Sequence, residues 1–111
     1  MNNDQPVKLL LVGAGSRGEV WTKVCSEATN VDLVGIVDRD LDRAKHARSS
    51  YANQDTLIEQ DMGRALKATQ PEAVLVATPP STHYKLVSSA LSEGKHVLCE
   101  KPLSEEISEV V

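Results

Sequence analysis

Aromatic residues are scarce in this 111-residue chain, which holds one tryptophan, two tyrosines and no phenylalanine. A basic excess is also lacking, since 16 acidic residues against 12 Lys and Arg give a formal net charge of −4. A nucleic-acid surface combines clustered Lys and Arg with stacking rings, so this composition argues against a nucleic-acid partner. No apolar run approaches the length that spans a bilayer, so we expect no membrane partner either.

Cysteine is equally scarce. Cys25 and Cys99 are the only two, they lie far apart, and neither belongs to a C-x-x-C pair. The opening residues, MNNDQPVK, have neither the basic nor the apolar region of a secretory leader. We therefore expect reduced, structural cysteines and a cytoplasmic protein. His46 and His96 have no metal-ligand spacing with each other or with either cysteine, so we expect no metal.

Short apolar runs alternate along the chain with amphipathic stretches, and the length predicts one domain. The runs are continuously apolar, which suits strands buried on both faces of a parallel sheet. The predicted strands are 7–13, 31–38, a weaker one at 56–58, 73–78 and 96–100. Right-handed crossovers between them predict a doubly wound parallel α/β sheet, the Rossmann fold, with strand order 3-2-1-4-5.

Helical spacing predicts which positions of the intervening helices face the core. They are Val20, Val24 and Ala28 in the first helix, Leu41, Ala44 and Ala47 in the second, and Leu86, Val87, Ala90 and Leu91 in the fourth. A third helix is expected over 62–68 and is ended by Pro71. Ser81 is the expected N-cap of the fourth helix and Gly94 its C′ residue, and Ser104 is expected to cap a last helix.

Three of the six glycines fall within VGAGSRGEVW, between a predicted strand and a predicted helix. A tight turn is the simple interpretation, but G-x-G-x-x-G in this setting is typical of dinucleotide binding. Gly13 permits the turn, Gly15 lets a pyrophosphate approach the backbone, and Gly18 lets the helix pack close to the sheet. The N–H groups of the first helical turn, which holds Ser16 and Arg17, then face the phosphates in the favourable field of the helix dipole.

An acidic residue ends the next predicted strand, as the same fingerprint requires. Asp38 stands twenty positions after Gly18, where its carboxylate can accept hydrogen bonds from both hydroxyls of an adenine ribose. Its charge would repel a 2′-phosphate, so NAD is favoured over NADP. The neighbouring Arg39 could accommodate that phosphate or cover the adenine, which leaves NADP as the alternative. At this point of the argument S-adenosylmethionine and FAD also remain open as ligands.

The second half, VLVATPPSTHYKLVSSALSEGKHVLCEKPLSEE, resembles the Gfo/Idh/MocA family of NAD(P)-dependent oxidoreductases, the glucose–fructose oxidoreductase and inositol dehydrogenase group. The glycine-rich loop, VDRD, ATPPSTH and CEKP occur in family order and spacing over essentially the whole chain. The resemblance implies an enzyme that passes a hydride between NAD(P) and a hydroxyl-bearing carbon of a sugar or cyclic polyol. It also implies that Thr78, Pro79 and Pro80 line the cofactor near its nicotinamide ribose, and that Lys101 is catalytic at the cofactor–substrate junction.

The position of Lys101 in the chain agrees with that role. It follows a predicted strand at the edge of the sheet where ligands bind, and a lysine there can polarise a substrate hydroxyl or carbonyl. Pro102 restricts the backbone of Lys101 to extended conformations. Glu100 is a candidate for orienting neighbouring groups by the family pattern alone. His83 is included among the cofactor-binding candidates, although a structural role is the simpler interpretation for it.

Members of the resembled family continue well beyond the length of this chain. The continuation supplies a sixth strand and a second α/β domain with the catalytic histidine or tyrosine. We therefore expect residues 1–111 to be the nucleotide-binding, N-terminal part of a longer two-domain protein, inactive by itself, with a homo-oligomer left open. A free-standing module is the alternative organisation, and a non-catalytic NAD(P)-responsive regulatory protein is the alternative function.

Overall fold

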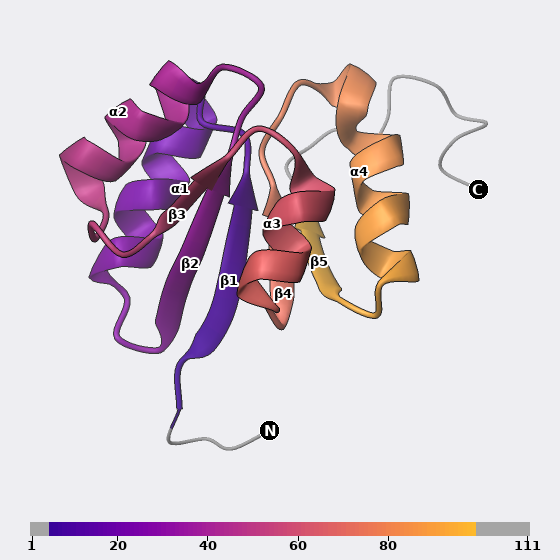
Figure 1. Cartoon of the computed structure of the whole chain (residues 1–111), viewed down its shortest axis with the longest axis horizontal. Helices are drawn as coiled ribbons and strands as arrows, with labels where there is room; N and C mark the ends of the chain where they lie inside the picture. The colour runs from indigo at the N-terminus through magenta and orange to yellow at the C-terminus, as the bar shows by residue number, and fades with distance from the viewer. Residues whose placement is uncertain (1–4, 100–111) are drawn as a thin grey trace.

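The computed structural model describes residues 5–99, which form one parallel sheet with helices on both faces (Figure 1). The strands lie in the order β3-β2-β1-β4-β5. Their bounds are β1 (Val7–Val12), β2 (Val31–Val37), β3 (Leu57–Glu59), β4 (Ala73–Val76) and β5 (His96–Cys99). The predicted doubly wound sheet with order 3-2-1-4-5 is confirmed.

Two helices cover each face of the sheet (Figure 1). The helices of the described chain are α1 (Ser16–Glu27), α2 (Leu41–Tyr51), α3 (Met62–Thr69) and α4 (Pro80–Ser92). Side chains of α1 and α2 join one buried cluster, and those of α3 and α4 join the other. The chain changes face after β3, because right-handed crossovers run toward β3 in the first half and toward β5 in the second.

The central strand β1 explains why continuous apolar runs are needed here. Leu9 and Leu11 join the cluster under α1 and α2, whereas Leu10 and Val12 join the cluster under α3 and α4. None of the four is more than 6% exposed, so both faces of the strand are core. A strand buried on both faces has no position for a polar side chain, which is the origin of the unbroken LLLV.

The carboxyl ends of β1 and β4 lie side by side at one edge of the sheet. Leu9 to Val12 pair with Ala73 to Val76, and the Ala77 N–H donates to the Val12 carbonyl oxygen at 2.8 Å. From β1 the chain continues toward β2, and from β4 toward β5, so the connections diverge between these two strands. Such a topological switch point is where open α/β sheets bind their ligands.

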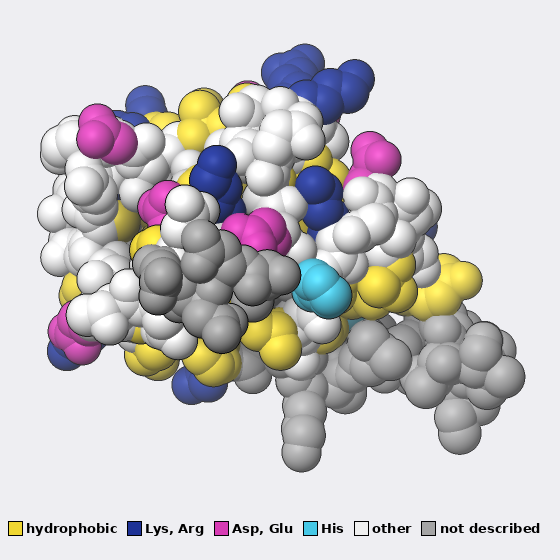
Figure 2. Space-filling view, turned by 90° about the horizontal axis from the view of Figure 1, so that it is seen from below, with side chains coloured by type: hydrophobic (Ala, Val, Ile, Leu, Met, Phe, Trp, Pro, Cys, Tyr) yellow, Lys and Arg dark blue, Asp and Glu magenta, His cyan; other side chains and the backbone are white. Residues whose placement is uncertain are grey.

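The opposite edge, where the strands begin, carries both signs of charge. Figure 2 views the molecule from that end, and on this face the acidic and basic side chains are interspersed with apolar ones. Strand β1 begins at that end in Figure 1, so this face is opposite the loops that follow β1 and β4.

The predicted buried face of α1 is wrong. Its buried residues are Gly18, Thr22 and Cys25, whereas Val20 and Val24 are each 47% exposed. The Thr22 hydroxyl donates to the Gly18 carbonyl oxygen at 2.8 Å within the helix, so a polar residue can face the sheet with its hydrogen bond satisfied. Small residues on that face bring the helix close to the strands and leave the valines at its flank.

In α2 the expected core positions Ala44 and Ala47 are confirmed, since neither side chain is exposed to solvent. The third helix ends at Thr69, and Gln70 takes a left-handed backbone with φ +48° directly before Pro71. The weak third strand exists but begins one residue later than expected, at Leu57. Thr56 precedes it as a buried residue whose hydroxyl donates to the Leu33 carbonyl oxygen at 3.0 Å.

The ends of α4 differ from the prediction at its start. Pro79 occupies the N-cap position and Pro80 the first helical position, so Ser81 lies inside the helix and the N-cap prediction is wrong. Proline suits the first turn because its fixed φ is already helical and no intrahelical N–H is lost. At the other end Gly94, with φ +76°, is the C′ residue as predicted. Ala90 is buried, but Leu91 is 57% exposed and does not belong to the core.

Candidate functional site

Gly13 forms the turn out of β1 and is constrained in two ways. Its φ of +107° is strained for any residue with a side chain. A Cβ at this position would also lie 2.8 Å from the Ala77 carbonyl group and 2.9 Å from the Thr78 nitrogen. The loop after β1 therefore lies directly against the chain leaving β4, and only glycine permits that contact.

Gly15 is the N-cap residue of α1 and has open space around it. A Cβ built on Gly15 would meet nothing within 4 Å, and no side chain caps the helix. Ser16 and Arg17 follow as exposed residues of the first turn. The first N–H groups of a helix have no intrahelical acceptor, so this end is arranged to receive an anion.

Gly18 is packed against the glycine-rich loop itself. A Cβ there would collide with the carbonyl oxygen of Gly13. The expectation was a close approach of the helix to the sheet, and the atoms that require glycine prove to be those of the turn at the end of β1. The first turn of α1 is thereby fixed beside the loop that precedes it.

Asp38 follows β2 and connects its own turn to the glycine-rich loop. One carboxylate oxygen accepts a hydrogen bond from the Ala14 N–H at 2.8 Å, and the other accepts from the Asp40 N–H at 2.8 Å. Its own N–H donates to the Glu59 carbonyl oxygen at 3.0 Å, and the residue is half-buried. Each carboxylate oxygen can accept a further hydrogen bond, so the group can bind a ligand hydroxyl while it holds the loop.

Arg39 is exposed beside Asp38, and its backbone is held by a residue that the sequence did not single out. The Gln60 side-chain amide donates to the Arg39 carbonyl oxygen at 3.0 Å. Gln60 lies in the turn between β3 and α3, so this bond joins two neighbouring loops at the carboxyl edge of the sheet. No short motif marks Gln60, because the contact spans 21 positions of the sequence.

The loop after β4 is held by two side chains from the first turn of α4. The ring of His83 is 1% exposed, and its Nε2 is hydrogen-bonded to the Thr78 carbonyl oxygen. The Thr82 hydroxyl lies 2.6 Å from the Thr78 hydroxyl and 2.9 Å from the Pro79 carbonyl oxygen. Pro79 is exposed and Pro80 begins α4. No role was predicted for Thr82 from the sequence, although its spacing of four from Thr78 is that of one helical turn.

The structure thus brings together, at one edge of the sheet, most of the residues that the sequence predicted for the site. The glycine-rich loop contacts the Thr78 loop at Gly13 and the Asp38 turn at Ala14. Glu100, Lys101 and the helix expected from Ser104 lie outside the described residues. In residues 5–99 no three His, Cys, Asp or Glu side chains gather as metal ligands would.

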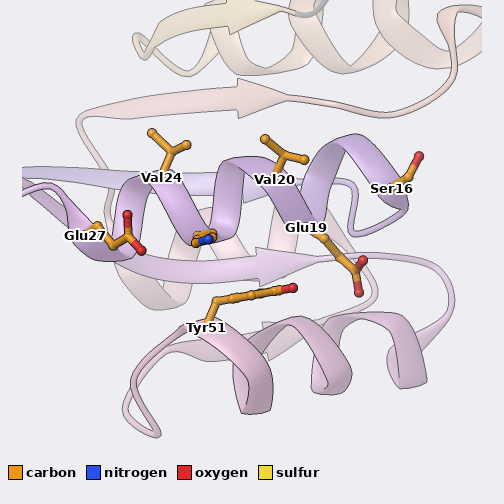
Figure 3. A pocket seen from close by; sticks show the side chains of 7 residues that line it. Ser16, Glu19, Val20, Val24, Glu27 and Tyr51 are labelled. Atoms are coloured by element: carbon orange, nitrogen blue, oxygen red, sulfur yellow. The ribbon is translucent and has the colours of Figure 1, made fainter.

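Two hollows lie outside the loops after β1, β2 and β4, although the first reaches Ser16 at the start of α1. One is a groove along the outer side of α1 that reaches Tyr51 of α2 (Figure 3). Tyr51 extends across the gap toward α1, whereas Val20 and Val24 point away from α2, so the lining groups do not converge. The other hollow lies near the start of β2, around Asp32 and Thr56. Neither gathers reactive groups as the loops after β1, β2 and β4 do.

The described part of the chain holds no helix long and apolar enough to cross a membrane. Its single clear pKa shift among the described residues is at Cys25, where burial raises the pKa of the thiol. The thiol lies in the core between α1 and the sheet, so it is structural. Cys25 and Cys99 are not joined by a disulfide.

A five-stranded doubly wound sheet, a glycine-rich turn into a helix and an acid after the second strand together define a dinucleotide-binding Rossmann domain. The sequence model of the Gfo/Idh/MocA group, described as "Oxidoreductase family, NAD-binding Rossmann fold", matches residues 7–111. The chain belongs to this oxidoreductase family and is an NAD-binding domain of it.

Relatives of known activity agree with the family. The chain is 34% identical over 103 residues to inositol 2-dehydrogenase 4 of Saccharopolyspora erythraea. The matched segment covers 92% of the chain and 30% of the relative. It is 31% identical over 98 residues to D-glucoside 3-dehydrogenase of Escherichia coli. Here the matched segment covers 87% of the chain and 27% of that enzyme. The chain therefore spans less than a third of the length of these relatives.

A solved structure with bound NAD has the same fold. It is GenD2 from gentamicin A biosynthesis, which superposes with a TM-score of 0.85 at 27% identity over 98% of this chain and 30% of GenD2. Scyllo-inositol dehydrogenase from Lactobacillus casei superposes with a TM-score of 0.84 at 21% identity, which shows the shared fold.

Proposed function

We propose that the chain binds NAD(H) across the edge where β1 and β4 end, as the nucleotide-binding part of an oxidoreductase acting on a sugar or cyclic polyol. The adenine ribose would bind Asp38, and the pyrophosphate would lie over Gly15 at the start of α1. The nicotinamide end would then reach the Thr78–Pro79 loop. The observation that carries this proposal is the hydrogen bond from the Ala14 N–H to Asp38, since it joins the proposed ribose acceptor to the proposed phosphate loop.

The open surface at Gly15 supports the pyrophosphate position. Nothing lies within 4 Å of a Cβ built there, in contrast to Gly13 and Gly18, where neighbouring backbone fills the space. Glycine at position 15 is thus not required by the packing of the chain itself. A ligand that approaches the backbone closely explains it.

The substrate class is inferred from the relatives. Inositol 2-dehydrogenase and D-glucoside 3-dehydrogenase both oxidise a ring alcohol by their names, so we infer a hydroxyl-bearing carbon of a sugar or cyclic polyol. Lys101 is the proposed catalytic residue, because it comes two positions after the end of β5 in the sequence and its amine can assist the proton transfer. In a protein of the relatives' full length that carries this chain, Lys101→Ala is expected to lose most of its turnover while it keeps its affinity for NADH. Full turnover in that variant would mean that Lys101 is not the catalytic residue.

A cytoplasmic location completes the proposal. It is supported by Cys25 and Cys99, which are not joined by a disulfide and so suit a reducing compartment. Sedimentation of a full-length protein that carries this chain would measure whether it forms a homo-oligomer.

Titration of the chain with NADH and NADPH tests the binding directly, with energy transfer from Trp21 as the signal. Trp21 lies in the second turn of α1, near the proposed phosphate site. Saturable binding with preference for NADH is the expected result. A folded chain that binds neither nucleotide would contradict the proposed site.

A further inference from the structure

His83 is a buried polar residue that the proposed dinucleotide contacts do not use. It lies in the first turn of α4, behind the loop that follows β4, and only 1% of it is exposed. A buried ring of this kind is costly unless its nitrogens are paired. Its Nε2 pairs with the Thr78 carbonyl oxygen, and since a carbonyl only accepts, Nε2 carries the hydrogen.

The Thr78 backbone held in this way is in contact with the glycine-rich loop. A Cβ on Gly13 would lie 2.9 Å from the Thr78 nitrogen, so the two loops touch through their main chains. A shift of Thr78 would therefore move one wall of the crevice at the switch point relative to the other. Pro79 and Pro80 add stiffness to the same segment, because each has its φ fixed.

A second side chain holds the loop from the same helical turn. The Thr82 hydroxyl contacts the Thr78 hydroxyl at 2.6 Å and the Pro79 carbonyl oxygen at 2.9 Å. The side-chain oxygen and the carbonyl oxygen of Thr78 are thus both bonded to α4. Two separate side chains of this turn converge on one residue at the ligand edge of the sheet.

We propose that His83 is a positioning residue for the cofactor. Through its Nε2–H it fixes the Thr78 carbonyl oxygen, and with Thr82 it positions the loop 77–79 on the nicotinamide side of the proposed site. This inference rests on the proposed function, because it assumes that the dinucleotide lies across this edge. It predicts that His83 matters for the nicotinamide half of the ligand and not for the adenine half.

The test compares NADH with ADP, which has the adenosine and the pyrophosphate but neither the nicotinamide nor its ribose. His83→Leu fills the space without the hydrogen bond, and it is expected to weaken the binding of NADH by about five- to tenfold while that of ADP changes by less than about twofold. His83→Gln returns a donor near the position of Nε2 and is expected to recover most of the NADH affinity. His96→Leu is the matched control, since His96 is exposed and begins β5 at the opposite edge.

Equal weakening of NADH and ADP binding would show a general structural role and overturn the proposal, and so would unchanged affinity for NADH. If His83→Leu does not fold, Thr82→Val takes its place. It removes one hydroxyl from a half-buried residue, and it must show the same selective loss of NADH affinity.

Amide hydrogen exchange of the unliganded chain gives a readout that is independent of NADH. The Ala77 N–H, bonded to Val12, and the Thr82 N–H, bonded to Pro79, should exchange faster in His83→Leu and return toward the original rate in His83→Gln. Unchanged exchange would contradict the positioning role. Failure of the unaltered chain to bind NADH would count against the proposed function alone, because the exchange rates would still decide whether His83 orders the loop.

Discussion

Asp38 shows how one side chain can serve both the fold and the ligand. Its carboxylate receives N–H groups from Ala14 and from Asp40, so it organises the phosphate loop and the β2–α2 turn at once. A ribose would bind to a group that is already oriented. Preorganisation of this kind lowers the ordering cost that binding must overcome.

Asp38→Ala is expected to weaken NADH by about tenfold or more, because a hydrogen bond to a charged group contributes roughly 1.5–3 kcal/mol. NADPH should lose less, since the same change removes the repulsion of its 2′-phosphate, so the NADH/NADPH affinity ratio should fall. The measurement is the pair of Trp21 titrations. Asp32→Ala provides the control, because Asp32 is an exposed acid near the start of β2, the strand that Asp38 follows. An unchanged ratio would mean that Asp38 is not the ribose acceptor.

Gly15→Val is expected to abolish measurable NADH binding while the chain keeps its fold. The backbone at Gly15, with φ −72° and ψ −162°, is open to any residue, and its Cβ meets no atom of the chain. The valine would instead occupy the space of the pyrophosphate. Gly15→Ala should give an intermediate affinity, and circular dichroism should show all three proteins equally helical. Retained affinity in Gly15→Val would leave the glycines with the role of a turn.

At the scale of the element, α1 departs from ordinary amphipathic packing. Its buried side is small and partly polar, and its valines lie at the flank (Figure 3). The cause is the fixed contact of Gly18 with the Gly13 carbonyl, which sets the helix close to the turn before it. The approach of the backbone, and not the burial of the largest side chains, determines how α1 is oriented.

Gly18→Ala is therefore expected to lower the free energy of unfolding by at least about 2 kcal/mol, because a backbone carbonyl cannot move aside as a side chain can. Gly63→Ala in α3 is the matched helical control. A Cβ there would meet the Asp61 carboxylate at an ordinary 3.6 Å, so the change should be neutral or stabilising by up to about 1 kcal/mol. Urea unfolding of both variants makes the comparison. Equal stability of the two would contradict the assigned contact.

At the scale of the whole molecule, the buried thiol of Cys25 makes the free energy of unfolding depend on pH in the alkaline range. Burial raises the pKa of its thiol above the usual 9.0, so the folded chain keeps a proton that the unfolded chain has lost. The contribution of Cys25 is complete below pH 9.0 and declines as the pH rises from there through the folded-state pKa. In a Cys99→Ser background, unfolding free energies between about pH 8 and 10 should fall more steeply with Cys25 than with Cys25→Ala. Parallel curves would mean that the thiol is not desolvated.

The strand order, the crossovers and the position of the glycine-rich loop could be predicted from the amino-acid sequence alone. These follow from local signals: unbroken apolar runs at β1, β2 and β4, and the spacing from Gly18 to Asp38. Gly94 at the end of α4 and the buried alanines of α2 could be predicted for the same reason, since each depends on its own segment.

The buried face of α1 and the contacts between the ligand loops depend on the tertiary structure and could not be predicted from the sequence. Val20 and Val24 have the pattern of core residues, but the contact between Gly18 and Gly13 turns them outward. The bond from Asp38 to Ala14 joins residues of two strand ends that no local pattern relates. Such contacts form when the strands align in the sheet, so their geometry depends on the fold as a whole and not on the spacing of residues within one segment.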